Sequence, residues 1–284
     1  MKIFVTGASG QVGSEFIRAF AGHDIITASR PEFDLADERS VRSAIESAAP
    51  DLVLHPAAFT DVDGCEREPL RAYQINTLGT RNVALASRRV GATLVAISTD
   101  YVFDGAKGEP YLEWDEPNPL SVYGRSKLAG EREALTHHDR CYVVRTSWVY
   151  SPRGRNFVKT MLRLASERPR LTVVDDEVGG PTLAGDLADA VSQLVGTGVY
   201  GIYHLANAGL CSRWELARQT VAALYPTVAV LPTSTADYLA RYPLPARRPA
   251  FSPLANVAGA ALGITLRPWD EALASFIADY PTNP

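Results

Sequence analysis

The stretch Gly7-Ala8-Ser9-Gly10-Gln11-Val12-Gly13 decides the fold. It follows a short β-rich run at residues 2–6 and precedes a helical pattern at residues 15–21. In that context the glycines let the main chain approach a pyrophosphate, and the free N–H groups at the start of the helix can bind it. The spacing is Gly-x-x-Gly-x-x-Gly, whereas the dehydrogenase fingerprint is Gly-x-Gly-x-x-Gly. The context nevertheless favours a dinucleotide-binding turn over a tight turn without a ligand.

Strand-like and helix-like patterns alternate outward from this turn. We expect strands at residues 25–28, 51–55, 92–98 and 141–144, and helices at 38–49, 72–90 and 123–135, with Asp37 as the N-cap of the first of these helices. The run 92–98 shows no polar alternation, which suits a strand buried on both faces. The alternation predicts an α/β fold: a Rossmann-type doubly wound parallel sheet covered by helices on both sides.

The pattern loosens after about residue 150. Helices are expected at 156–167, 183–194, 214–224 and 269–278, and a strand at 201–205, while residues 226–253 are rich in proline and short on periodicity. We therefore expect an NAD(P)-binding Rossmann domain at residues 1–150. Residues 151–284 would form mainly a smaller C-terminal substrate-binding lobe, with some elements returning to the sheet.

Composition excludes several classes of protein. The 284 residues carry a formal net charge of −4, which gives no electrostatic case for binding nucleic acid or an anionic membrane. We find no apolar run of about 18 residues and no signal-peptide core. The three cysteines are scattered without a Cys-x-x-Cys pair, and the five histidines show no metal-ligand spacing. A cytoplasmic protein with no metal site is the expectation.

The end of the second predicted strand bears on the choice of cofactor. An acidic residue there would select NAD, but the sequence has Ser29-Arg30. A guanidinium at Arg30 could hold a 2′-phosphate through two parallel bonds, which favours NADPH without excluding NADH. Alternatively Arg30 is simply solvated. Asp34-Leu35 could flank the adenine ring, and small residues after the third strand, within His55-Pro56-Ala57-Ala58-Phe59, would let the main chain pass the cofactor.

A proton donor is suggested by Tyr123 and Lys127, which lie four apart at the start of a predicted helix and therefore on one face. A phenol has a pKa near 10, and a nearby ammonium would lower it, although desolvation offsets part of that effect. The alternative is an ordinary surface tyrosine and lysine. Ser98 or Thr99, at the carboxyl end of the fourth strand, could bond a reacting carbonyl, or could only cap the strand end.

Together these pieces resemble an extended short-chain dehydrogenase/reductase and, more narrowly, the dTDP-4-dehydrorhamnose reductase family. The resemblance spans nearly the whole chain. It rests on the glycine turn and on five further motifs: residues 57–63 (AAFTDVD), 98–105 (STDYVFDG), 119–131 (PLSVYGRSKLAGE), 145–150 (RTSWVY) and 180–182 (GPT), together with Arg248-Pro249. The block at 98–105, the block around Tyr123 and Trp148 are specific to this family, whereas the glycine turn and Tyr-x-x-x-Lys are shared by the superfamily.

The resemblance implies the roles of individual residues. Thr99, Tyr123 and Lys127 would be catalytic, with Lys127 also holding the nicotinamide ribose. Thr99, Asp100, Tyr101, Trp148 and Arg248 would bind a dTDP-sugar. The cofactor residues would be Gly7, Gly10, Gln11, Val12, Gly13, Arg30, Asp34, Leu35, Ala57, Ala58, Phe59, Tyr123 and Lys127. The resemblance also implies the reaction: family members reduce the C4 ketone of dTDP-4-dehydro-6-deoxy-L-mannose (dTDP-4-dehydrorhamnose) to give dTDP-L-rhamnose.

The sequence departs from the family pattern at three places. Phe251 stands where many relatives have asparagine, and residues 175–179 (DDEVG) are more acidic than usual, so another 4-keto-6-deoxyhexose is possible as substrate. Some relatives dimerise through magnesium held by glutamates; Glu15 matches one, but Gly185 stands at the second position, so no metal is expected. We expect a monomer or a homodimer. Two other functions stay open: a non-catalytic cofactor-binding regulatory subunit, and a sugar-nucleotide epimerase or dehydratase.

Overall fold

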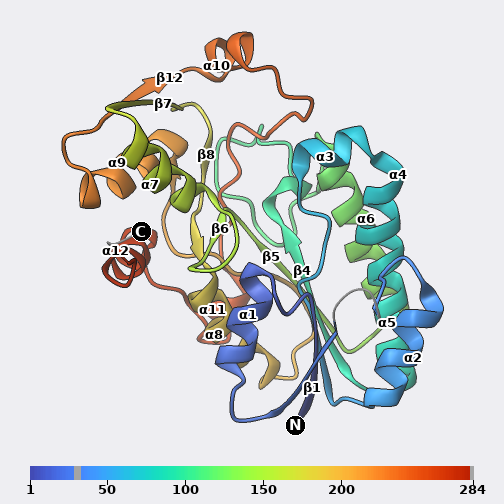
Figure 1. Ribbon diagram of the computed structural model, residues 1–284. Helices are drawn as coiled ribbons and strands as arrows, with labels where there is room; N and C mark the ends of the chain where they lie inside the picture. The colour runs from blue at the N-terminus through green and yellow to red at the C-terminus, as the bar shows by residue number, and fades with distance from the viewer. Residues whose placement is uncertain (29–32, 282–284) are drawn as a thin grey trace.

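The computed structural model describes residues 1–28 and 33–281. Its centre is a parallel sheet with the strand order β10-β5-β4-β3-β1-β2 (Figure 1). The strands are β1 (Lys2–Thr6), β2 (Asp24–Ala28), β3 (Leu52–His55), β4 (Thr93–Thr99), β5 (Cys141–Thr146) and β10 (Gly201–His204). The order reverses between β1 and β3, and open α/β sheets bind ligands in the crevice at the carboxyl ends of the strands at such a point.

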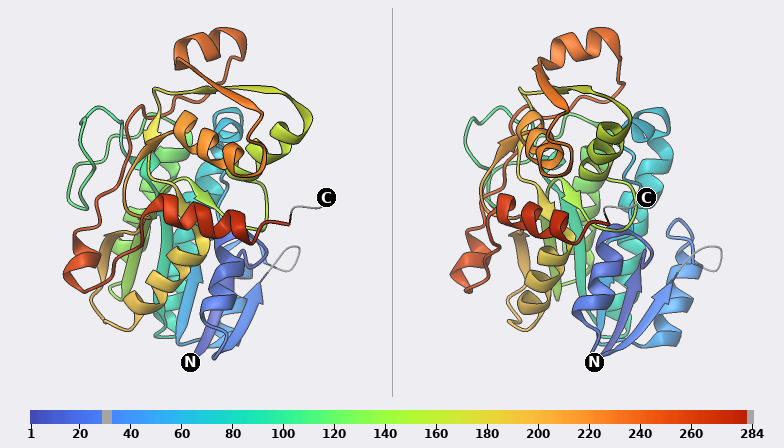
Figure 2. Two further views of the ribbon diagram at one scale, coloured as in Figure 1. Left: turned by 90° about the vertical axis from the view of Figure 1, so that its left-hand side faces the viewer. Right: turned by 60° about the vertical axis from the view of Figure 1, so that its left-hand side comes forward.

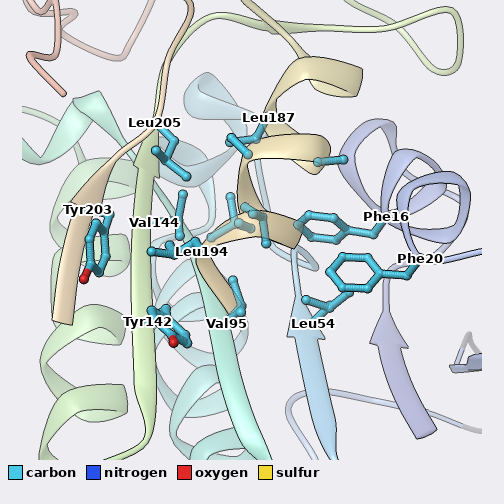
Figure 3. Packing of buried hydrophobic residues seen from close by; sticks show 14 of the residues in the cluster. Phe16, Phe20, Leu54, Val95, Tyr142, Val144, Leu187, Leu194, Tyr203 and Leu205 are labelled. Carbon is cyan, nitrogen blue, oxygen red and sulfur yellow. The ribbon is translucent and has the colours of Figure 1, made fainter. Parts of the chain in front are cut away.

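Helices cover both faces of the sheet. On one face lie α1 (Gln11–Ala19) and α8 (Ala184–Val195); on the other lie α2 (Glu38–Ala48), α5 (Gly79–Arg89) and α6 (Val122–His137). Side chains alternate along β1, so Ile3 and Val5 join the first core whereas Phe4 joins the second. Figure 3 shows the first core, in which Phe16 of α1 and Leu187 of α8 pack over the strands. The predicted fold class is confirmed.

The remaining elements join the strands or build the C-terminal lobe. Before residue 150 these are α3 (Val62–Arg67), α4 (Pro69–Ala72), the π-helix η1 (Tyr73–Leu78), the 3₁₀ turn η2 (Asp100–Val102) and β6 (Val149–Tyr150). After it come α7 (Phe157–Glu167), β7 (Arg170–Val174), β8 (Val178–Gly179), β9 (Thr182–Leu183), β11 (Cys211–Ser212), α9 (Arg213–Leu224), β12 (Ala229–Thr233), α10 (Thr235–Arg241), α11 (Ala258–Ala261) and α12 (Trp269–Ala278).

The C-terminal lobe, formed by α7, α9, α10 and the β7–β12 pair, lies beyond the carboxyl ends of the central strands (Figures 1 and 2). It has its own apolar core, in which Met161 of α7 packs with Leu171 of β7 and Val221 of α9. Two later elements return to the central layers: β10 extends the sheet beside β5, and α8 packs beside α1. The boundary at residue 150 stays a prediction.

Two sequence expectations about secondary structure need correction. The helix expected at residues 72–90 begins earlier, at Pro69, and contains the π-helical segment η1. The proline-rich segment 226–253 is more regular than its sequence indicates, because β12 pairs with β7 and the side chain of Ser234 caps α10. A pairing partner that lies over fifty residues away is invisible to local periodicity. The predicted cap of α2 is confirmed, since the Asp37 side chain accepts the Arg39 N–H at 2.9 Å.

Candidate active site

The turn between β1 and α1 leaves main-chain donors free. Gly10 is the N-cap of α1, with φ −77° and ψ 174°, and no side chain caps this helix. The Gly10 N–H donates to the Gly7 carbonyl oxygen at 2.9 Å and so closes the turn. The first N–H groups of a helix have no partner inside it, and the helix dipole favours an anion beside them. The turn therefore fits a dinucleotide pyrophosphate.

Gly13 lets α1 pack directly on this turn. A Cβ at Gly13 would lie 2.9 Å from the Ala8 Cα and closer still to the Gly7 carbonyl oxygen. Both obstacles belong to the main chain, which cannot move aside as a flexible side chain can. The third glycine of the motif is thus required for close helix–strand packing, as in other dinucleotide-binding turns.

A cavity of about 890 Å³ begins at this turn and passes the carboxyl ends of β3, β4 and β5. It brings together most of the residues that the sequence indicated. Those on its wall are Gly7, Gly10, Gln11, Val12, Gly13, Leu35, Ala57, Ala58, Thr99, Asp100, Tyr101, Tyr123, Lys127 and Trp148. Segments that are far apart in the sequence thus meet in one continuous site, which is large enough for a cofactor and part of a second ligand.

One predicted site residue, Arg30, lies outside the described residues. Three others are not on this wall. Asp34 accepts the Ala36 N–H at 3.1 Å and is exposed. Phe59 exchanges main-chain hydrogen bonds with the Asn76 side chain, at 2.7 and 3.1 Å. Arg248 donates to Asp63 Oδ2 at 2.8 Å. Their expected roles in binding stay predictions.

Lys127 is buried, and its Nζ donates to the main-chain oxygen of Ile97 at 2.6 Å. It lies on α6, whose N-cap Ser121 accepts the Gly124 N–H at 3.1 Å. Burial lowers the pKa of the Lys127 ammonium to about 8, and the nearby carboxylate of Glu131 opposes that shift. The ammonium is therefore held at the end of β4, one turn of helix from Tyr123.

Tyr123 is buried near the carboxyl end of the same strand, with its ring edge-on to Tyr101 at 5.6 Å between centroids. Burial raises the pKa of the Tyr123 phenol, whereas its hydrogen bond with the Thr99 side chain lowers it. Desolvation outweighs the contacts that lower this pKa, so the net shift is upward. The phenol consequently keeps its proton at neutral pH.

Ser98 and Thr99, the two candidates for bonding a reacting carbonyl, differ in their hydrogen bonds. The Ser98 hydroxyl donates to the carboxylate of Glu131, which also forms a buried ion pair with Arg145 at 2.8 Å. Thr99 instead contacts Tyr123, and its hydroxyl donates to Asp100 Oδ1 at 3.1 Å. Both residues border the cavity, but Ser98 is held by the Glu131–Arg145 pair and Thr99 by the groups around the phenol.

Asp100 connects the end of β4 to the C-terminal part of the chain. The Ser252 hydroxyl donates to Asp100 Oδ2 at 2.6 Å, and both side chains are buried. Burial raises the pKa of Asp100 to about 6, against the opposing effects of the Ser252 and Thr99 hydrogen bonds and of the Arg213 charge. Ser252 follows Phe251, one of the positions at which the sequence departs from the family pattern, but neither residue is on the cavity wall.

Trp148 follows β5 in an unusual conformation. Its φ is +44°, a left-handed value that non-glycine residues rarely adopt. The indole packs so closely on Gly179 of β8 that a Cβ there would lie 2.7 Å from the indole Nε1. Left-handed backbone at a bulky residue persists only where the surroundings impose it. The chain thus fixes the Trp148 ring at the wall of the cavity.

Several polar residues of the wall were missed from the sequence, among them Asn156 and Arg213. Asn156 Nδ2 donates to Gln11 Oε1 at 2.9 Å and so joins the start of α7 to the phosphate turn. Arg213, the first residue of α9, lies over the Trp148 ring with its guanidinium carbon 3.5 Å from the ring centroid. The Ser212–Glu215 capping box could have located the start of α9. No local signal reveals that this helix faces Trp148.

A second, smaller cavity of about 260 Å³ is lined by Glu15 and Gly185 among others. The Glu15 carboxylate there accepts a hydrogen bond from Arg18 at 2.8 Å. Within residues 1–28 and 33–281 there is no cluster of three or more His, Cys, Asp or Glu side chains that could hold a metal ion. Across the same ranges, no helix is both long and apolar enough to span a membrane.

Comparisons with known proteins agree with this geometry. Residues 1–282 match the family described as RmlD substrate binding domain. The chain is 41% identical over 283 residues to a dTDP-4-dehydrorhamnose reductase from Sinorhizobium fredii, covering 96% of this chain and 95% of that protein. The chain belongs to the dTDP-4-dehydrorhamnose reductase family. It is also 42% identical over 280 residues to the spore coat polysaccharide biosynthesis protein SpsK of Bacillus subtilis, covering 98% and 97% of the two chains.

Solved structures of the reductase family share the fold. A dTDP-4-dehydrorhamnose reductase from Bacillus anthracis, in complex with NADP, superposes with a TM-score of 0.92 at 38% identity, covering 98% of this chain and 99% of that one. An orthologous reductase from Clostridium acetobutylicum gives a TM-score of 0.93 at 39% identity, with the same coverage. A UDP-glucose 4-epimerase from Thermus thermophilus, at 22% identity and a TM-score of 0.80, shares the fold alone.

Proposed function

We propose that the protein reduces the C4 ketone of dTDP-4-dehydrorhamnose, or of a closely related dTDP-4-keto-6-deoxyhexose, with NADPH. The observation that carries the proposal is the convergence of Tyr123, Lys127 and Thr99 in one cavity that begins at an uncapped phosphate turn. The names of the relatives and the NADP held by the Bacillus anthracis structure support it. NADH is expected to replace NADPH less effectively.

The chain's own residues suit a reduction. A bound nicotinamide in its reduced form supplies the hydride that adds to C4. Tyr123 donates a proton to the C4 oxygen, and its raised pKa keeps that proton in place until an alkoxide, a stronger base than a phenolate, develops. Thr99, in hydrogen-bond contact with Tyr123, orients the phenol and the carbonyl oxygen. The Lys127 ammonium offsets negative charge left on the phenol.

Positioning accounts for the rest of the arrangement. The main-chain donors at the start of α1 hold the pyrophosphate of the dinucleotide, and Lys127 holds its nicotinamide ribose. On the other side of Tyr123, Asp100 and Trp148 contact the sugar nucleotide. The two ligands would thereby meet at the end of β4, where the reacting carbon and the donor hydroxyl lie together.

Turnover tests the proposal directly. Purified protein is incubated with NADPH and dTDP-4-dehydrorhamnose, and the loss of reduced nicotinamide absorbance is followed. Stoichiometric oxidation with formation of a C4 hydroxyl is expected. Epimerases and dehydratases of this fold retain their cofactor, so net consumption separates them from a reductase. Bound cofactor without turnover would instead favour a regulatory subunit. A cytoplasmic location, and a monomeric or homodimeric state, stay predictions from the sequence.

A further inference from the structure

Among the described residues, the cavity wall carries three cationic side chains, Arg155, Lys127 and Arg213. Arg155 follows Gly154, whose position against the Gln11 side chain puts it near the phosphate turn. Lys127 is buried, with its Nζ bonded to the Ile97 carbonyl. Arg213 lies over Trp148 and close enough to Asp100 to lower the pKa of that carboxyl group. The dinucleotide pyrophosphate can be bound by main-chain N–H groups, whereas the phosphates of a second ligand need another group near them, and a cation suits that role.

The guanidinium of Arg213 is fixed in place and pairs with Glu177 through its Nε. Its flat face stacks on the Trp148 ring at 3.5 Å, with the Phe157 ring at 5.2 Å. Its acidic neighbour is Glu177, at 3.7 Å between Nε and Oε2, which is longer than a good hydrogen bond. Stacking leaves the N–H edge of a guanidinium available, and that edge matches the paired oxygens of a phosphate.

A second guanidinium close enough to act on Tyr101, that of Arg248, already has hydrogen-bond partners. Arg248 donates to Asp63 Oδ2 at 2.8 Å and to the Ala246 oxygen at 3.1 Å, and it is not on the cavity wall. Meanwhile the carboxyl groups of Asp100 and Glu177 lie close to Arg213, as their electrostatic coupling to it shows. An anionic ligand placed here without a cation would be repelled by these carboxylates.

We propose that Arg213 binds the diphosphate of the sugar nucleotide, with Trp148 holding the guanidinium in the required plane. The inference rests on the proposed function, because it assumes a dTDP-linked substrate. Arg213 is then a substrate-binding residue that determines preference for a nucleoside diphosphate over the nucleoside. The nicotinamide cofactor, bound at the glycine turn, should not depend on it.

The test compares ligands that differ in their phosphates. Binding of dTDP and of thymidine is measured by calorimetry on the NADPH-saturated wild-type protein and on Arg213→Gln. Removing charge-assisted hydrogen bonds should weaken dTDP binding by roughly 10- to 100-fold. Thymidine and NADPH affinities should stay within about threefold of wild type. Arg213→Lys, which keeps the charge but loses the planar fork, should fall between wild type and Arg213→Gln.

Arg218 on the same helix provides a matched control. Its guanidinium also lies over a tryptophan, Trp214 at 5.4 Å, but the side chain is exposed and outside the cavity. Arg218→Gln should bind dTDP as the wild type does. Equal loss of dTDP in both variants would show a general charge effect and would overturn the assignment.

Other outcomes separate this inference from the proposed function. Unchanged dTDP binding in Arg213→Gln, an equal loss of dTDP and thymidine, or a selective loss of NADPH would each overturn the role of Arg213 while leaving the reductase proposal intact. Should Arg213→Gln fail to fold, unchanged dTDP binding in Arg213→Lys would overturn it. A wild-type protein that binds NADPH but neither dTDP nor the ketosugar would contradict the proposed function itself.

Discussion

The two ends of the cavity are built in different ways. The phosphate-turn end is local: one stretch of seven residues, which runs from the end of β1 into the first turn of α1, supplies the tight turn, the free N–H groups and the close packing of the helix. The far end is assembled from separate places in the chain. Asp100 follows β4, Trp148 follows β5, Gly179 lies in β8, Arg213 begins α9 and Ser252 precedes α11.

This difference reflects the two ligands, since the dinucleotide is common to many enzymes and the sugar nucleotide is specific to few. A dinucleotide presents the same pyrophosphate to many enzymes, so a main-chain site with no side-chain requirement serves it. A sugar nucleotide must be distinguished from its relatives, which needs side chains at fixed positions. Tyr123 lies where the two ends meet, so substitutions at the three places should have effects of different kinds and sizes.

Loss of the Tyr123 hydroxyl should have the largest effect. Tyr123→Phe removes the proton donor but keeps the ring, so kcat should fall by about 10²- to 10⁴-fold. NADPH affinity, measured by fluorescence titration, should change little, because the phosphate turn is untouched. Tyr142→Phe is the control, because this buried phenol lies in the sheet core and is not on the cavity wall. Near-normal turnover in Tyr123→Phe would exclude the phenol as the essential acid.

A methyl group at Gly13 should damage the phosphate-turn end. In Gly13→Ala the new Cβ meets main-chain atoms of Gly7 and Ala8, so overpacking should lower the free energy of unfolding by about 1–3 kcal/mol. NADPH binding should weaken by at least roughly tenfold, since displacement of α1 moves its N–H donors. Gly22→Ala is the matched control, because a Cβ there meets no atom within 4 Å. Equal NADPH affinity in the two variants would contradict the proposed cofactor position.

A methyl group at Gly179 should damage only the substrate end. The Cβ of Gly179→Ala would collide with the Trp148 indole, which is a side chain rather than main chain, so the loss of stability should be smaller than for Gly13→Ala. The KM for the ketosugar should rise by roughly tenfold or less, at about 1 kcal/mol of lost contacts, while NADPH affinity stays normal. Steady-state kinetics with each substrate varied in turn measures both. A matching rise in the KM for NADPH would show that the substitution affects both binding sites, and would contradict their independence.

The smallest effect should be a pH dependence confined to the substrate end. Because the pKa of Asp100 is raised to about 6, its carboxyl group is ionised above that pH and neutral below it. Losing a negative charge near a diphosphate should lower the KM of the sugar nucleotide a few-fold as the pH falls through 6. NADPH affinity should stay level. Asp100→Asn, which is neutral throughout, should show a flatter profile; an unaltered profile would assign the titration to another group, such as Glu177.

The same contrast explains how much could be predicted from the sequence. The phosphate turn, the Tyr123–Lys127 pair and the parallel sheet follow from local spacing, because residues near one another in the chain decide them. The choice of Thr99 over Ser98 and the role of Trp148 could be predicted only from the resemblance to a family. The stacking of Arg213 on Trp148 depends on how α9 packs against the end of β5, some sixty residues earlier in the chain, so no local pattern reveals it.

The pKa of Tyr123 shows a limit of a different kind. The pattern Tyr-x-x-x-Lys indicates a nearby positive charge, but it does not reveal how deeply the phenol is buried. In the folded chain that burial raises the pKa, and Lys127 itself loses part of its affinity for a proton for the same reason. Desolvation depends on everything packed around a group, and it therefore appears only once the fold is known.

The most direct test of the central claim follows the transferred hydrogen itself. The reaction is run with the ketosugar and NADPH that carries deuterium at the transferable position of the nicotinamide, and the sugar is examined by NMR. Our account predicts deuterium at C4 of the product, on one face only, and none there when Tyr123→Phe replaces the wild type over the same time. Deuterium retained on the nicotinamide, or found at another carbon of the sugar, would contradict it.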